Sequence, residues 1–389
     1  MVSSSVFTTA AAMAVTLLLV AMPVSAGAQT YQKDYIGKAQ TYRAKFEDTL
    51  VHLAREHNLG FVEMRAANPR LDPWLPGEGA KVILPTRHIL PDAPREGIVI
   101  NLAEMRLYYF PAGTAAEPPS YPISPGREGL RTPVGTTTIQ RKVVGPTWRP
   151  TARMRSEDPT LPAAFPPGPD NPLGTHALYL GWPEYLIHGT NKPYAIGRMA
   201  SSGCIRMYPE SVRDLYPRVP NGTRVTVVDQ PVKVGWIDDK MYVEVSPTQE
   251  QSKLIENLGE LSSYEITADD MKRITAKAGG LADNIDWDAV RKAVREHRGY
   301  PVPVLERGGV KGAKVIDEMD DEAPQEVSAA HNGKAAQAVQ EAGPAERNAP
   351  QDAGDAKAGA KEQKRPDAPV AKKMSEEAPA PRRAITLNP

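Results

Sequence analysis

The stretch YLIHGTNKPYAIGRMASSGCIRMYP, residues 185–209, decides the fold because it joins strand-forming sequence to the only cysteine of the chain. A β-branched and aromatic run ends at His188, and SSGCIRM predicts a tight turn that leads to a helix beginning near Pro209. A lone cysteine is a small buried apolar residue, a surface thiol, a metal ligand or a nucleophile. The rest of the chain has to distinguish these roles.

A nucleophilic thiol needs a base within hydrogen-bonding reach and donors for the oxyanion that forms when a carbonyl is attacked. His188 has the chemistry of such a base. Gly203 allows close backbone approach, and the amides of residues 202–204 can converge on one oxygen. These residue types indicate acyl transfer at an amide or ester.

Two other readings of the same residues stay open. Cys204 can be a buried structural residue, with His188 hydrogen-bonded at the end of its strand. A zinc site made by His176, His188 and Cys204 is possible by ligand type, but the spacing matches no compact metal motif.

Short strand-forming runs surround this stretch from Glu96 to about Asp229 and predict a β-rich domain over residues 96–230. The longest helical pattern there is YPESVRDLYPRV, residues 208–219. A proline-rich insertion, residues 158–174, is either a substrate loop or a surface excursion. The predicted strands lie in GIVINL, RLYYFP, TTTIQRKVV, HALYLGW, YLIHG and RVTVVD.

Residues 41–86 predict a small module with the order strand, helix, helix, strand. Asp48 is the expected cap of a first helix, a second helix runs from about Phe61 to the Asn68-Pro69 break, and KVILP ends the module as a strand. This order resembles a LysM carbohydrate-binding module. An ordinary small α+β cap is the alternative.

Residues 231–305 predict a hairpin around Asp238-Asp239 followed by two helices capped by Thr267 and Asp286 and closed by glycines. They carry no catalytic constellation, so we expect a scaffolding role. Residues 310–389 mix Ala, Pro, Glu and Lys without any aromatic residue and predict a disordered tail.

The first 28 residues predict an export signal. The apolar run AAAMAVTLLLVAMPV, residues 10–24, precedes Ala26-Gly27-Ala28, which offers small residues at a cleavage site. No Lys or Arg precedes the run, which departs from a strong signal. We expect a periplasmic protein that is peripheral to the membrane at most.

Export makes the single cysteine informative, because exported proteins mostly use cysteines in pairs. An unpaired thiol is exposed to oxidation there unless it is buried or useful. The chain has 47 basic and 47 acidic residues, so no basic excess points to nucleic acid as a partner.

The ordered motifs resemble the YkuD family of L,D-transpeptidases. They are TPVG (132–135), IHGTN (187–191), IGR (196–198) and SSGCIRM (201–207). Residues 89–110 resemble the entry to this domain in ErfK-type envelope members, and the whole resemblance covers about residues 41–235. It implies a β-rich α+β fold with a YkuD-type mixed β-sandwich as the catalytic domain.

The resemblance implies a role for each matching residue. Cys204 is the nucleophile, His188 is the general base, and the backbone carbonyl of Gly189 holds the imidazole in its productive tautomer. Many members have histidine directly before the Gly-Cys pair, where this chain has Ser202, which supplies no charge to the thiol. The expected substrate-binding residues are Arg206, Ser201, Ser202, Gly203, Asn191 and Thr190; Arg206 can equally be structural, and Thr190 and Asn191 simple turn formers.

The implied reaction is a two-step exchange on peptidoglycan. The thiolate attacks the meso-diaminopimelate carbonyl of a tetrapeptide stem and expels D-alanine, and an amine then takes the acyl group from the thioester. The amine belongs to a second stem, to a lysine of an envelope protein or to a free D-amino acid. No metal or cofactor is implied. The alternatives are a carboxypeptidase or cysteine peptidase that uses water, and a silent peptidoglycan-binding protein.

Overall fold

The structure is a computed structural model that describes residues 29–127, 130–199, 201–258 and 265–309. The predicted signal peptide, residues 1–28, and the predicted tail, residues 310–389, lie outside the described residues.

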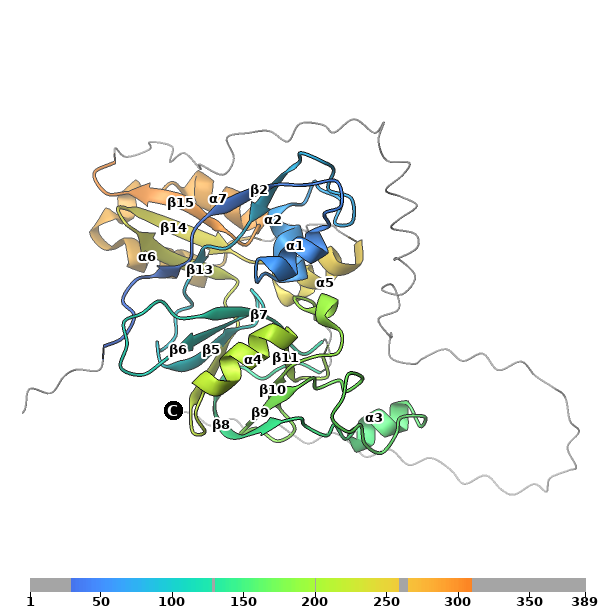
Figure 1. Cartoon of the computed structure of the whole chain (residues 1–389). Coiled ribbons are helices and arrows are strands. Elements are labelled where there is room, and N and C mark those ends of the chain that lie inside the picture. The colour runs from blue at the N-terminus through green and yellow to red at the C-terminus, as the bar shows by residue number, and fades with distance from the viewer. Residues whose placement is uncertain (1–28, 128–129, 200, 259–264, 310–389) are drawn as a thin grey trace, which may run out of the picture. The chain divides into compact units, whose positions relative to one another are not determined.

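Eight strands close into a barrel with the order β10-β11-β7-β6-β5-β12-β8-β9. The pairs β5–β12 and β10–β11 run parallel, and the other neighbours are antiparallel. Helix α4 (Pro209–Arg218) follows β11 and crosses the barrel (Figure 1). The strands are β5 (Gly97–Asn101), β6 (Arg106–Phe110), β7 (Ser120–Ser124), β8 (Gly135–Val144), β9 (His176–Leu180), β10 (Leu186–His188), β11 (Ile205–Met207) and β12 (Arg224–Val228).

The β-branched and aromatic residues that predicted the strands fill the main core. Ile98 and Ile100 of β5 lie beside Val225 and Val227 of β12 and are buried in one cluster. The prediction of a β-sandwich is wrong in one respect, because the strand order returns to its start and leaves no open edge. Closure depends on pairings between distant segments, which no local pattern contains.

The sequence SSGCIRM was predicted to be a tight turn, and that prediction is incomplete. Residues Ile205–Met207 form strand β11, which is hydrogen-bonded between β10 on one side and β7 on the other. A strand of three residues carries too short an alternation to be recognised alone. Its two neighbours hold it extended, and this places Cys204 at the beginning of a strand.

The N-terminal segment has the predicted order of elements. Strand β2 (Gln40–Arg43) pairs with β3 (Lys81–Leu84), and helices α1 (Leu50–Glu56) and α2 (Phe61–Ala67) lie between them. Thr49, rather than the predicted Asp48, caps α1 by accepting a hydrogen bond from the His52 amide. The Asp48 carboxylate instead accepts from the amide of Lys45 in the preceding turn.

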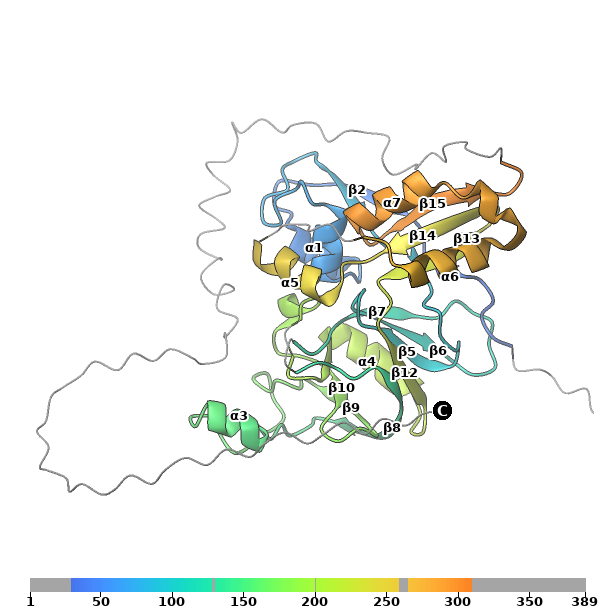
Figure 2. The ribbon, with the colours of Figure 1, turned by 180° about the vertical axis from the view of Figure 1, so that it is seen from behind.

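A second sheet follows the barrel in the chain. Strands β13 (Val232–Ile237), β14 (Lys240–Val245) and β15 (Pro301–Glu306) form it, and Asp238 takes the positive φ of 52° that a tight hairpin requires. Helices α6 (Ala268–Ala278) and α7 (Trp287–Glu296) pack on one face of this sheet (Figure 2).

The predicted caps of these two helices are confirmed at their N-termini. Thr267 and Asp286 accept hydrogen bonds from the first-turn amides of α6 and α7. Helix α7 does not end on a glycine as predicted: His297 adopts the left-handed conformation with a φ of 32°. The ring of His297 is buried, and this burial, rather than a glycine, holds the end of the helix in the left-handed conformation.

The remaining described elements are short connections. They are β1 (Tyr35–Ile36) paired with β4 (His88–Ile89), α3 (Ala152–Glu157), the 3-10 turns η1 (Pro193–Ala195) and η2 (Gly279–Asn284), and α5 (Gln249–Leu258). Within the part of the chain that the structure describes, we find no helix with the length and apolar character needed to cross a membrane.

A cluster of buried charges joins the barrel to its neighbours. Lys233 of β13 forms ion pairs with Glu104, which follows β5, and with Glu244 of β14 at 2.9 Å. On the other side of the cluster, Arg106 of β6 pairs with Glu63 of α2 at 2.9 Å. Each of these side chains is at most 9% exposed, so the pairs are shielded from solvent.

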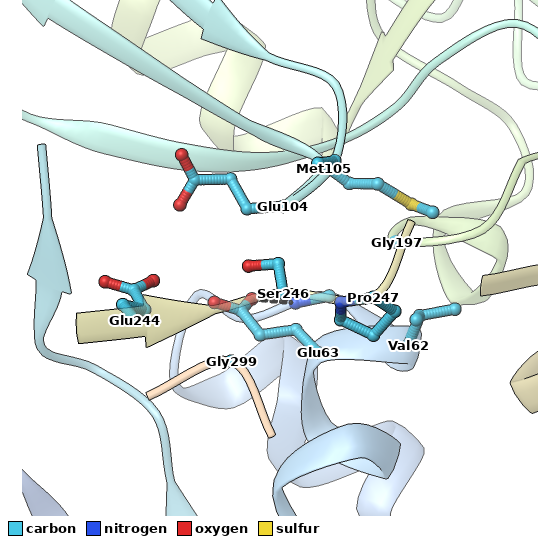
Figure 3. Close-up of a pocket in the computed structure, with 11 residues that line it drawn as sticks. Val62, Glu63, Glu104, Met105, Gly197, Glu244, Ser246, Pro247 and Gly299 are labelled. Atoms are coloured by element: carbon cyan, nitrogen blue, oxygen red, sulfur yellow. Dashed lines mark hydrogen bonds between the residues drawn. The ribbon is translucent and has the colours of Figure 1, made fainter. Parts of the chain in front are cut away.

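Glu63, Glu104 and Glu244 are among the residues that line a cavity of about 20 Å³, and Figure 3 shows their side chains. That volume suits a single water molecule rather than a substrate. His88 lies between two of these carboxylates, 3.6 Å from Glu63 and 3.6 Å from Glu244, and burial lowers the pKa of His88 to about 3. The cluster was not predicted, because the sequence does not show which charged residues become buried.

Candidate active site

Strands β10 and β11 position the predicted dyad. Their parallel register places His188 opposite Arg206 and Ile187 opposite Ile205. Side chains alternate along a strand, so Ile187 and Ile205 enter the core while His188 and Arg206 share the other face. Cys204 immediately precedes β11, so the thiol stands at the end of the strand that pairs with the strand of the imidazole.

His188 is a buried, neutral imidazole. Its Nδ1 lies 2.6 Å from the Gly189 carbonyl oxygen, which is the contact that the sequence predicted. A carbonyl can only accept, so Nδ1 carries the proton and Nε2 is left as the basic nitrogen. Burial and the nearby Arg206 cation lower the pKa of His188 to about 3. Hydrogen bonds with the Gly189 and Leu173 backbones act in the opposite direction and raise this pKa.

Cys204 is half-buried at the start of β11. Its thiol donates a hydrogen bond to the Glu184 carbonyl oxygen at 3.3 Å. The sequence predicted His188 as the partner of the thiol, and this hydrogen bond goes elsewhere. Burial raises the pKa of the Cys204 thiol, while a hydrogen bond from the Leu186 backbone and the charge of Arg206 act in the opposite direction. The resting pair is consequently a neutral thiol and a neutral imidazole.

The loop before Cys204 is fixed by its own hydrogen bonds. Gly203 has a φ of 106°, which favours glycine, and its amide donates to Ser201 Oγ at 3.2 Å. The Ser201 hydroxyl also donates to the Cys204 carbonyl. The Gly203 amide is thus occupied, and the predicted convergence of the loop amides on one oxygen requires this contact to open.

Thr132 is a supporting residue whose function the sequence did not reveal, although it belongs to the TPVG motif. Its hydroxyl donates to the Gly203 carbonyl at 2.8 Å and accepts from the Gly126 amide at 3.0 Å, and the residue is buried. It thereby connects the segment before β8 to the cysteine loop. The only signal in the sequence was the place of this threonine in the TPVG motif.

The other predicted site residues differ in their burial and in their hydrogen-bond partners. Arg206 is half-buried, and its charge acts on both members of the dyad. Ser202 is half-buried in the cysteine loop. The hydroxyl of Thr190 accepts from the Lys192 amide at 2.9 Å, and Asn191 donates to the Asp170 carbonyl at 3.1 Å. The contacts of Thr190 and Asn191 are those of turn-forming residues.

Aromatic side chains near the motif also differ in position. The ring of Tyr185 lies against Gly203, where an added Cβ would be 3.0 Å away, and meets Trp182 edge to face with centroids 6.0 Å apart. Trp148 packs on Phe165 inside the proline-rich insertion. His176, one of the ligands in the zinc alternative, packs its ring on Tyr216.

A family model described as the L,D-transpeptidase catalytic domain, YkuD, matches residues 95–227. The chain is 40% identical over 259 residues to "Probable L,D-transpeptidase YbiS" of Escherichia coli strain K12, covering 65% of this chain and 82% of that protein. It is 39% identical over 264 residues to "Probable L,D-transpeptidase ErfK/SrfK" of Salmonella typhimurium, covering 66% and 82%. A solved L,D-transpeptidase from Mycobacterium smegmatis is 19% identical with a TM-score of 0.28, covering 38% and 65%.

The family model and the two curated relatives define the class of the protein, which is a cysteine acyltransferase. The chain belongs to the YkuD family of L,D-transpeptidases. It is a peptidoglycan L,D-transpeptidase, and the family acts on peptidoglycan stem peptides.

Proposed function

We propose that Cys204 and His188 perform the acyl transfer as nucleophile and general base. The observation that carries this proposal is that His188 ends β10 and Cys204 immediately precedes its parallel partner β11, together with the Nδ1 contact to Gly189 that leaves Nε2 as the basic nitrogen. His188 Nε2 takes the thiol proton as Sγ attacks the meso-diaminopimelate carbonyl. The proton then goes to the leaving D-alanine amine, and a thioester remains on Cys204.

In the second step an acceptor amine attacks the thioester carbonyl. His188 takes a proton from this amine and returns it to the Cys204 sulfur as the amide forms, which restores the enzyme. We propose a second stem peptide or a lysine of an envelope protein as the acceptor, in the periplasm. The half-buried Arg206 lies on the same face as His188 and offers a cation to a substrate carboxylate. Ser201, Ser202, Gly203, Thr190 and Asn191 then shape the loops around the bound stem.

Product analysis tests this function. Purified protein is incubated with disaccharide tetrapeptide, with and without an added D-amino acid, and the muropeptides are analysed by mass spectrometry. We expect release of D-alanine together with cross-linked dimers or exchanged stems. Shortened tripeptide monomers as the sole product would show that water is the acceptor and contradict the transferase assignment of this site.

We also propose that residues 41–86 are a LysM-like module that holds the glycan near the thiol. Support comes from the β2-α1-α2-β3 order and from an open groove of about 430 Å³ between α1 and the η1 turn. Arg55 of α1 lies over the Tyr194 ring and forms a two-pronged ion pair with Glu210 at the groove. Attachment to a polymer raises the local substrate concentration. We expect the full chain to cosediment with purified sacculi, and chitin oligosaccharides to reduce that binding.

The neutral resting pair predicts how thiol reactivity depends on pH. Because burial raises the pKa of Cys204, the thiolate fraction grows about tenfold for each pH unit up to at least the ordinary thiol range. Alkylation of Cys204 by iodoacetamide should therefore accelerate continuously from pH 6 to pH 9, as measured by mass spectrometry. A plateau below pH 7 would reveal a preformed thiolate–imidazolium pair instead.

A further inference from the structure

The proline-rich insertion between β8 and β9 ends beside the candidate base. Its last residues, Asn171 to Gly174, pack on the backbone that follows His188. Gly174 has a φ of 64°, and a Cβ added there would lie 2.7 Å from the Thr190 amide nitrogen. Only glycine fits this approach without displacement, so the two segments are in direct contact.

Asn171 organises this end of the insertion. It is 1% exposed, and both halves of its amide are engaged. Oδ1 accepts from the Leu173 amide at 2.9 Å. Nδ2 faces the carbonyl oxygens of Pro146, Phe165 and Pro166 at 2.8, 3.1 and 3.0 Å, which joins the two ends of the insertion.

The Leu173 carbonyl connects this turn to the imidazole. It would lie 3.4 Å from a Cβ placed on Gly189, the residue whose carbonyl oxygen contacts Nδ1 of His188. The position of Leu173 depends on Asn171, because the side chain of Asn171 accepts a hydrogen bond from the Leu173 amide. Asn171 therefore holds Leu173 against the residue that orients the ring of His188.

We propose that Asn171 is a positioning residue that fixes Leu173 against Gly189 and so keeps the Gly189 carbonyl on Nδ1 of His188, which leaves Nε2 as the basic nitrogen. The inference rests on the proposed role of His188 as base. Asn171 touches neither the thiol nor the substrate. It acts through Leu173, and the insertion thereby contributes to the orientation of the base from outside the YLIHGTN segment.

The test compares Asn171→Ala and Asn171→Asp with the full-length protein. Loss of the side chain frees the Leu173 peptide, and a misdirected base of this kind costs about tenfold to a hundredfold in kcat. We expect that loss with KM little changed. Arg153→Ala is the matched control, because the exposed side chain of Arg153 lies in helix α3, just before the insertion, and pairs with Glu157; we expect it to retain full activity.

A spectroscopic readout separates positioning from a general loss of structure. In protein labelled with ¹⁵N-histidine, and assigned with His188→Ala, the wild-type ring should show a protonated Nδ1 and an unprotonated Nε2. In Asn171→Ala the two nitrogen shifts should approach each other as the tautomers mix. Asn171→Asp keeps the acceptor for the Leu173 amide but sets a carboxyl oxygen against the three carbonyl oxygens. Its ring signals should therefore change less than those of Asn171→Ala, although its fold is less stable than that of the wild type.

The outcomes are distinct. A folded Asn171→Ala with wild-type kcat and an unchanged His188 tautomer would overturn the proposal, and so would a lower Tm with no change in the ring signals of the folded fraction. If Asn171→Ala does not fold, Asn171→Asp is read by the same two criteria. Failure of the proposed function is separate, because it would appear as a wild-type protein that releases no D-alanine.

Discussion

Cys204→Ala should reduce D-alanine release from disaccharide tetrapeptide by at least about 10³-fold, because the acyl group then has no atom to form a covalent bond with. Cys204 is the only cysteine of the chain, so no other thiol can replace it. The measurement is amino-acid analysis of the released D-alanine over time at fixed enzyme concentration.

The substitution should leave the fold intact. The thiol is half-buried, and its hydrogen bond within the protein goes to the Glu184 carbonyl beside solvent. We expect Tm to change by no more than a few degrees. Cys204→Ser is the matched control, since its hydroxyl can still donate to Glu184 but is a far weaker nucleophile; it should also be inactive. Unimpaired turnover by Cys204→Ala would remove the thiol from the mechanism.

Lys233→Met should destabilise the protein by about 3–5 kcal/mol, the usual cost of removing one partner of a buried ion pair. Although burial alone would lower it, the carboxylates of Glu104 and Glu244 hold the pKa of Lys233 above its ordinary value, so the side chain is an ammonium. Without it, two buried carboxylates face each other and the Ile89 carbonyl loses a donor. Urea unfolding followed by circular dichroism measures the change.

Two further variants make that result specific. Lys233→Met combined with Glu104→Gln removes one of the unpaired charges, so the double variant should recover part of the stability lost by the single one. Arg131→Ala breaks an exposed pair with Glu250 and should cost at most about 1 kcal/mol. Equal losses for Lys233→Met and Arg131→Ala would show that the buried cluster contributes no more than a surface contact.

The sequence predicted local structure well where a pattern repeats over several residues. The β-branched and aromatic runs of β5, β6, β8, β9, β10 and β12 and the capped helices α6 and α7 were placed correctly, because these residue types and their flanking turn and cap residues favour the observed local structure. Strand β11 and the closure of the barrel were not, because both depend on pairing with distant segments. The cap of α1 moved by one residue because Thr49 and Asp48 are equally suitable in sequence.

The candidate site divides in the same way. Cys204, His188 and the Gly189 carbonyl could be named from the ordered motif, and the structure places His188 and Gly189 at the end of β10 and Cys204 immediately before its partner strand β11. Three hydrogen bonds were not predicted. They are those of the thiol to Glu184, of Thr132 to Gly203, and of Leu173 to Asn171. Each of these contacts joins segments that are far apart in sequence or uses a backbone carbonyl, which carries no signal in the residue type.

The central claim is that the stem peptide becomes covalently bound to one sulfur. Intact-mass spectrometry of the protein, quenched in acid shortly after mixing with disaccharide tetrapeptide, tests it most directly. We expect the protein to gain the mass of the acyl group, which is the disaccharide tetrapeptide without its D-alanine. The added mass should lie on the peptide that contains Cys204 and should be lost on treatment with hydroxylamine. Turnover of the substrate with no adduct at any quench time, or an adduct on another residue, would contradict it.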